Sequence, residues 1–310
     1  MATFANILYD DTFKVVLAEP SNRQLLIKLV EFFLPGKKIE SLSLDDKEQH
    51  GLILSDKNCT FDLYCTTDTG EQLIVEMQYS SQESFKDRML YYSTYPIRSQ
   101  LIQRFKDINE QEELVRKRGK MDYSLRPVHV ISILNFKLEH ERENTLEEGM
   151  ISRYDLRSER SGELMTDALH FVFFELARLP RKADEEKSCR TLLEQLAFSL
   201  KYGHLLRERP EGFEDEMLKL LFNATAFANM DELQLEKYNT IMTTKLDIIA
   251  QQEYAKKEGR VEGRLEGRVE GRAEGMRELI QKFIASGMPK EEIAGRLAMS
   301  INDLDELLDG

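Results

Sequence analysis

The sequence predicts an α/β fold, in which helices pack against a sheet, and four segments carry this prediction. Residues 61–65 and 73–79 are short, apolar and alternating, as expected for β-strands. Residues 127–136 are nearly all apolar and rich in β-branched side chains, which is typical of a central strand buried on both faces. Residues 21–34 instead repeat their large apolar side chains at helical spacing.

The elements between these segments follow from the same patterns. The first helix ends at Pro35-Gly36, and residues 38–44 are expected to form a strand. Residues 84–108 predict a helix, with a kink or a division into two helices at Pro96. The predicted order is therefore helix, strand, strand, strand, helix, strand, an αβββαβ arrangement.

The hairpin formed by the second and third strands brings two carboxylates together. Gly70 supplies the left-handed residue of a three-residue loop, and the resulting register puts Asp62 opposite Glu76. Opposed residues have Cβ atoms roughly 5 Å apart. Gln78 lies on the same face because strand side chains alternate. The odd-numbered apolar residues are expected to point to the other face and build a core (Phe61, Leu63, Cys65, Leu73, Val75 and Met77).

Two carboxylates at this separation repel each other, and the pKa of one of them rises unless a positive charge lies nearby. A divalent cation removes the repulsion, and Mg²⁺ or Mn²⁺ prefers such oxygen ligands. The hairpin alone leaves a second interpretation open. In that interpretation, Asp62 and Glu76 are ordinary polar residues on a solvent-facing strand.

Asp62 followed by Glu76-Met77-Gln78 resembles the D…(E/D)-x-(K/Q) motif of the PD-(D/E)xK nuclease superfamily. More narrowly, residues 1–180 resemble the Rpn family of recombination-promoting nucleases, also described as putative transposases. The other segments that carry this resemblance are Asp10-Asp11-Thr12-Phe13-Lys14, Gly70-Glu71, Arg88-Met89-Leu90-Tyr91-Tyr92 and Pro127-Val128-His129-Val130-Ile131-Ser132-Ile133.

The resemblance implies a restriction-endonuclease-like αβββαβ core with a helical C-terminal extension, and the activity of a metal-dependent DNA endonuclease. Asp62 and Glu76 would hold Mg²⁺ or Mn²⁺, the carbonyl of Met77 would complete the coordination, and Gln78 would position a water. Many superfamily members have Lys at the position of Gln78, so Lys14 is a candidate for the missing charge. The alternative is that Lys14 is an ordinary surface lysine beside Asp11. The implied biological setting is DNA recombination, transposition or defence against foreign DNA.

The glutamine also leaves an alternative function open, because an amide cannot supply positive charge. In that alternative, the chain is a catalytically weak or inactive nuclease fold that acts as a DNA- or protein-binding module. An RNA substrate is a further alternative, since a site that reads the backbone contains no obvious test for the 2′-hydroxyl.

Residues 84–120 are the candidate surface for nucleic acid. They contain nine basic and five acidic residues in a chain whose net charge is −13. That overall charge argues against indiscriminate, tight binding to nucleic acid and favours a local basic groove. The contact candidates are Lys86, Arg88, Tyr91 and Tyr92. The alternative is a solvated helix face with ordinary ion pairs.

Three regions follow the predicted nuclease domain at 1–180. Residues 181–250 are predicted to form a helical appendage, residues 251–275 contain a Glu-Gly-Arg repeat, and residues 276–310 form a small helical tail. The repeat, at 258–275, predicts either a self-associating helix, and hence a homo-oligomer, or a flexible charged linker. The last helix of the tail is acidic, which favours contact with protein over DNA.

The three cysteines form no CxxC pair, which favours free thiols and a cytoplasmic location. No apolar run approaches the roughly 20 residues of a membrane-spanning helix, so we expect no membrane partner.

Overall fold

The computed structural model describes residues 3–45, 48–49, 59–110, 123–140 and 146–309. The chain divides into two compact units, Met1–Ile241 and Met242–Gly310. Residues 181–241, which are part of the helical appendage predicted at 181–250, fall within the first unit.

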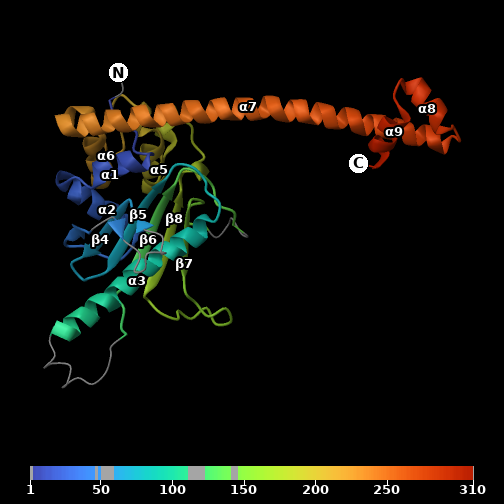
Figure 1. The fold of residues 1–310 in the computed structure, drawn as a ribbon. Coiled ribbons are helices and arrows are strands. Elements are labelled where there is room, and N and C mark those ends of the chain that lie inside the picture. The colour runs from blue at the N-terminus through green and yellow to red at the C-terminus, as the bar shows by residue number, and fades with distance from the viewer. Residues whose placement is uncertain (1–2, 46–47, 50–58, 111–122, 141–145, 310) are drawn as a thin grey trace. The chain divides into compact units, whose positions relative to one another are not determined.

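The first unit is built on a six-stranded mixed sheet, which confirms the α/β class (Figure 1). The sheet has three parallel strands at its centre, β5, β6 and β8, and antiparallel strands beside them. Across the sheet, the strands are β1 (Leu42–Leu44), β4 (Leu63–Thr67), β5 (Gln72–Gln78), β6 (Val128–Leu134), β8 (Leu169–Glu175) and β7 (Ile151–Asp155). A separate two-stranded sheet pairs β2 (Glu48–Gln49) with β3 (Cys59–Thr60).

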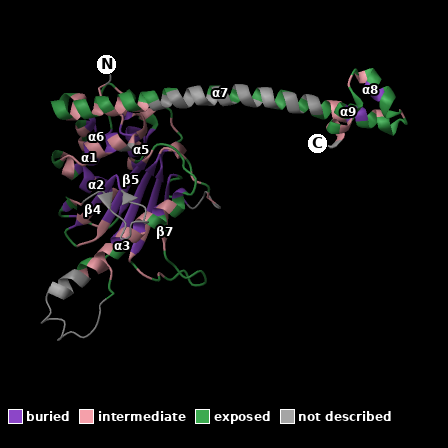
Figure 2. Cartoon of the chain, viewed as in Figure 1, coloured by how far each residue is buried: buried purple, intermediate pink, exposed green. Residues whose placement is uncertain are grey.

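Helices cover both faces of the large sheet, so its strands are buried between two layers (Figure 2). One face packs against α1 (Asp10–Leu17), α2 (Arg23–Phe33), α5 (Leu192–Tyr202) and α6 (Glu216–Thr225) in the larger core. The other face packs against α3 (Phe85–Glu110) in a smaller core. Short 3₁₀ helices connect these elements: η1 (Pro20–Asn22), η3 (Leu176–Arg178), η4 (Glu186–Ser188), η5 (Gly203–Leu205) and η6 (Phe227–Asn229).

Strand β6 shows why the central sheet needs both layers. All seven of its residues are buried, as its continuous apolar sequence predicted. Leu196 of α5 and Phe222 of α6 lie in the same hydrophobic cluster as Ile131 of β6. Residues beyond 180 therefore complete the core that the first 180 residues begin.

Helix α3 is a single helix of 26 residues that continues through Pro96, so the predicted division into two helices is wrong, whereas the predicted kink stays a prediction. Proline removes one backbone donor and normally kinks or ends a helix. Pro96 is buried, and the helix is anchored on the sheet through Phe85 and Met89. Tertiary packing therefore outweighs the local cost of the proline.

In the second unit, the end of α7 (Glu232–Ala285) packs with α8 (Lys290–Leu297) and α9 (Ile301–Asp309). Ile280, Ile293 and Leu304 form the buried centre of this small core. Residues 258–275 are helical within α7, so the structure favours the helix over the flexible linker. Self-association of that helix stays a prediction. None of the helices in the described part of the chain is both long and apolar enough to cross a bilayer.

Candidate active site

The hairpin of β4 and β5 has the predicted register. Leu63 pairs with Val75 and Thr66 pairs with Gln72, and Gly70 has a φ of +81° in the connecting loop. The regular ladder begins at Leu63, so Asp62 lies one residue outside it.

Asp62 and Glu76 continue the pairing through their side chains. The main-chain N–H of Asp62 donates to Oε1 of Glu76 at 3.1 Å. In return, the main-chain N–H of Met77 donates to Oδ2 of Asp62 at 2.8 Å. Each carboxylate is therefore held against the other strand by a backbone donor, and the two acidic groups are fixed side by side.

Both carboxylates are buried: Asp62 is 4% and Glu76 is 2% exposed. The interpretation of a solvent-facing strand is therefore wrong. That interpretation failed because helix α3 covers this face of the sheet, where Phe85 and Met89 pack over Tyr64 and Ile74.

Phe61 corrects another prediction. We expected it on the face of Leu63 and Cys65, but it packs in the α3 cluster with Tyr64 and Ile74. Alternation of side chains holds only within a regular strand, and the strand begins two residues later, at Leu63. The ring of Phe61 is 5.4 Å from that of Tyr92, so it joins the acidic pair to α3.

Lys14 of α1 supplies a positive charge from the opposite layer. Its Nζ lies 3.0 Å from Oδ1 of Asp62 in an ion pair. Asp62 is thus bound by a lysine at one oxygen and by the N–H of Met77 at the other. The structure brings Lys14, which the sequence offered only as a candidate, directly to the acidic pair.

Gln78 and Arg88 form the other side of the site. Nε2 of Gln78 donates to Oε2 of Glu76 at 3.4 Å, and a guanidinium nitrogen of Arg88 donates to Oε1 of Gln78 at 2.6 Å. Arg88 also donates to Gln82, and its guanidinium lies 5.8 Å from the ring centroid of Tyr92. The Nε atom of Arg88 is buried and makes no hydrogen bond within the described structure.

The four predicted nucleic-acid contacts occupy different environments. Arg88 lies inside the site, and Tyr92 packs against Phe61. Lys86 is exposed, and its ammonium donates to the carbonyl of Glu139 at 3.2 Å. Tyr91 is also exposed. Lys86 and Tyr91 therefore remain candidates for contact with substrate, whereas the position of Arg88 suits a role at the acidic pair.

The electrostatics of the site centre on Glu76. Burial raises the pKa of the Glu76 carboxyl well above its ordinary value, and the neighbouring charge of Asp62 raises it further. The backbone donor of Asp62, Arg88 and Lys14 oppose this shift. Arg88 and Lys14 therefore offset only part of the rise that burial and Asp62 cause in the pKa of Glu76.

These residues fit a hard divalent cation. Asp62 and Glu76 together contribute four carboxylate oxygens, the hard ligands that such a cation prefers. In the described ranges, no group of three or more His, Cys, Asp or Glu side chains is arranged to hold a metal. The site therefore offers two carboxylates, which suits an ion such as Mg²⁺ that binds through one or two carboxylates and keeps several waters.

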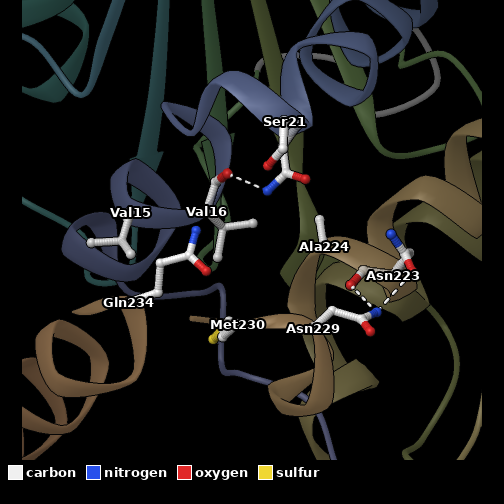
Figure 3. Close-up of a pocket in the computed structure, with 9 residues that line it drawn as sticks. Val15, Val16, Ser21, Asn223, Ala224, Asn229, Met230 and Gln234 are labelled. Atoms are coloured by element: carbon white, nitrogen blue, oxygen red, sulfur yellow. Dashed lines mark hydrogen bonds between the residues drawn. The ribbon is translucent and has the colours of Figure 1, made fainter. Parts of the chain in front are cut away.

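A cavity of about 190 Å³ in the first unit is lined by none of these residues, although Val15, which follows Lys14, is part of its lining (Figure 3). Amide side chains dominate its polar lining: Nδ2 of Asn22 donates to the carbonyl of Val16, and Nδ2 of Asn229 donates to Asn223. None of its lining residues carries a charge, so the cavity offers no group for acid–base or metal chemistry.

Sequence reasoning missed the link between Gln78 and Arg88. The two residues lie in different elements, a strand and a helix, and no fixed spacing joins them. The basic character of α3 was visible in the sequence, but the partner of each cation was not. The hydrogen bond depends on how α3 packs on the sheet.

A mixed sheet covered by helices on both faces defines a protein of the α/β class, in which Glu76 of β5 lies beside Asp62, one residue before β4. The chain belongs to the PD-(D/E)XK nuclease family transposases, because the model of that family matches residues 7–255. This match confirms the resemblance seen in the sequence and extends it over the helices after residue 180. No curated protein and no solved structure matches the chain.

Proposed function

We propose that this protein is a metal-dependent DNA endonuclease that hydrolyses phosphodiester bonds. The observation that carries the proposal is the buried pair of Asp62 and Glu76, held by reciprocal backbone hydrogen bonds beside two cationic side chains. Membership of the nuclease family supports the reaction class. The restriction-endonuclease-like αβββαβ core would then consist of α2, β1, β4, β5, α3 and β6, with the later helices as an extension.

Asp62, Glu76 and the main-chain carbonyl of Met77 would hold Mg²⁺ or Mn²⁺. When bound, such an ion lowers the pKa of a water ligand and neutralises negative charge on the phosphate oxygens. Glu76 must be ionised to serve as a ligand, and Arg88 and Lys14 favour that ionised form.

The other residues of the site would position the attacking water and stabilise negative charge on the phosphate. Gln78 uses one amide hydrogen on Glu76 and one lone pair for Arg88, which leaves a donor and an acceptor for a water. Arg88 fixes the orientation of that amide and places positive charge where the family motif has Lys. Lys14 compensates Asp62 and can pass from the carboxylate to a phosphate oxygen.

DNA is the proposed partner, and Lys86 and Tyr91 on α3 are the proposed contacts beyond the site. The proposed setting is DNA recombination, transposition or defence. Among the described cysteines, Cys65 and Cys189 are free thiols, which supports a reducing compartment such as the cytoplasm. A homo-oligomer through residues 258–275 is the proposed assembly.

Nicking of supercoiled plasmid tests the proposal. The full chain is assayed with Mg²⁺, with Mn²⁺ and with chelator, beside Glu76→Ala. Glu214→Ala is the matched control, because it removes a carboxylate that lies in surface ion pairs. We expect metal-dependent nicking that Glu76→Ala abolishes and Glu214→Ala retains. Equal nicking by the parent and a folded Glu76→Ala variant would contradict the proposal and favour the binding module.

A further inference from the structure

Two tyrosines lie at the edges of the candidate active site. Tyr79 is the first residue after β5 and directly follows Gln78. Tyr9 is the N-cap residue of α1, the helix that carries Lys14 to Asp62. Their rings pack together with centroids 4.9 Å apart and an interplanar angle of 34°. The pair therefore joins the two segments that deliver Gln78 and Lys14 to the acidic residues.

The pair presents an aromatic surface to solvent. Tyr79 is 43% exposed, whereas Tyr9 lies partly buried behind it. The segment before Tyr9 is anchored, because the N–H of Asn6 donates to the hydroxyl of Tyr238 at 3.3 Å, and the ring of Tyr238 packs on Phe227. The Tyr79 ring is thus packed against the Tyr9 ring, and the residue is partly exposed to solvent.

An exposed aromatic ring that packs on a second ring, next to a site that cleaves phosphodiesters, is suited to stack on a nucleobase. Base–aromatic stacking gives affinity without basic surface, which matters in a chain whose net charge is −13. Within a duplex, both faces of each internal base are already stacked on its neighbours, so a protein ring reaches an unpaired base at a lower cost in unstacking.

We propose that Tyr79, supported by Tyr9, stacks on an unpaired base next to the phosphodiester in the site, so that the preferred substrate is DNA with a single-stranded segment. This inference rests on the proposed nuclease function and specifies its substrate. Tyr79 is a positioning residue in this proposal, since it contacts a base and not the reacting atoms.

The test measures binding by the full chain in chelator, where metal-dependent cutting is prevented. The probe is a short oligodeoxynucleotide with a central 2-aminopurine, whose fluorescence is quenched when it stacks. It is used as a single strand and as a duplex of the same sequence. We expect the single strand to bind at least about tenfold more tightly than the duplex and to be quenched.

Three substitutions separate stacking from folding. Tyr79→Leu is expected to lower the affinity for the single strand about tenfold and to remove the quenching. Tyr79→Phe keeps the ring and is expected to keep both. Tyr123→Leu is the matched control, because Tyr123 is 64% exposed and precedes β6, at the opposite end of the parallel strands from Tyr79.

The inference is overturned if the parent does not bind the single strand, if it binds the duplex equally well, or if Tyr79→Leu matches the parent. Its failure is distinguishable from failure of the nuclease proposal. A parent that cuts plasmid, with a ratio of single-strand to duplex cleavage unchanged by Tyr79→Leu, overturns only the stacking inference. Binding that depends on Tyr79 without any cutting supports the stacking and overturns the nuclease.

Discussion

The guanidinium of Arg88 donates a hydrogen bond to Oε1 of Gln78 at 2.6 Å. Gln78 stands at the position where the family motif has Lys, and its amide cannot carry charge. Arg88 of helix α3 brings a positive charge next to Gln78. We propose that Gln78 and Arg88 together take the role of that lysine.

This relationship predicts how the nicking rate changes when the positive charge is removed from residue 88 and placed at residue 78. Arg88→Met is expected to lower metal-dependent nicking by at least about tenfold, because Gln78 loses its orientation and Glu76 loses a nearby cation. The double variant Arg88→Met with Gln78→Lys is expected to recover part of the rate. Plasmid nicking at fixed metal concentration measures both effects.

Lys219→Met is the control for Arg88→Met, because it removes a cation on α6 that lies in an exposed ion pair with Glu214. We expect it to change the rate much less than Arg88→Met. A double variant that is no faster than Arg88→Met alone would argue against the replacement of the lysine by the pair.

Lys14→Met is expected to destabilise the metal-free protein and to increase the stabilisation that a metal gives. Removing Lys14 leaves the buried Asp62 charge without its ion pair, at a cost of about 3 kcal/mol. In the variant, a bound cation then compensates the charge of Asp62 that Lys14 compensates in the parent. Urea unfolding with and without Mn²⁺ measures the difference.

The matched control for Lys14 is Lys28→Met, which breaks an exposed ion pair with Glu216. Its effect on unfolding is expected to stay below about 1 kcal/mol. If Mn²⁺ stabilises Lys14→Met no more than it stabilises the parent, then Lys14 does not compensate the carboxylate charge that a metal ion would otherwise compensate.

His129 predicts how stability depends on pH. It is 2% exposed, and its Nε2 lies 2.8 Å from Oε2 of Glu71. Burial lowers the pKa of His129 from 6.5 to about 4, with a smaller contribution from the neighbouring His170. The unfolded chain then binds the proton more readily than the folded one, so stability falls as the pH is lowered from 6.5 towards 4.

The loss from His129 is at most about 3 kcal/mol by the linkage of pKa to stability. Glu71, whose pKa is lowered in the folded protein mainly by Lys37 and His129 against the effect of burial, adds to the loss at the acidic end. His129→Gln cannot take up the proton and is expected to lose less stability between pH 7 and pH 4.5. Urea unfolding at the two pH values measures this, and equal losses in parent and variant would contradict the assignment.

The Glu-Gly-Arg repeat at residues 258–275 predicts that replacing its glycines by alanine changes the self-association of the chain. A Cβ added at Gly267, Gly271 or Gly275 meets no atom within 4 Å. The triple Gly→Ala variant is therefore expected to stabilise α7 by up to about 1 kcal/mol per site. If the glycines allow close approach of a second copy, the same variant weakens association.

Sedimentation velocity over a range of concentrations, with circular dichroism for helix content, measures both effects of the glycine substitutions. A parent that is monomeric at every concentration would exclude the homo-oligomer. Association that is unchanged in the triple variant would mean that the glycines do not form the contact.

The sequence by itself determined the hairpin and its acidic pair. Gly70 and the alternation of Leu63 to Cys65 and Leu73 to Met77 act over neighbouring residues, so the register could be derived without the rest of the chain. Strand β6 was equally clear, because a strand buried on both faces has a continuous apolar sequence.

Only the tertiary structure decided the surroundings of that pair. Lys14 and Arg88 come from helices on opposite faces of the sheet, and no sequence spacing encodes their distance from Asp62 and Gln78. The burial of Asp62 and Glu76, the placement of Phe61 and the continuity of α3 through Pro96 also depend on packing between layers. Local patterns fix which residues pair within a hairpin, whereas charge compensation and burial are set by elements that meet only in the folded chain.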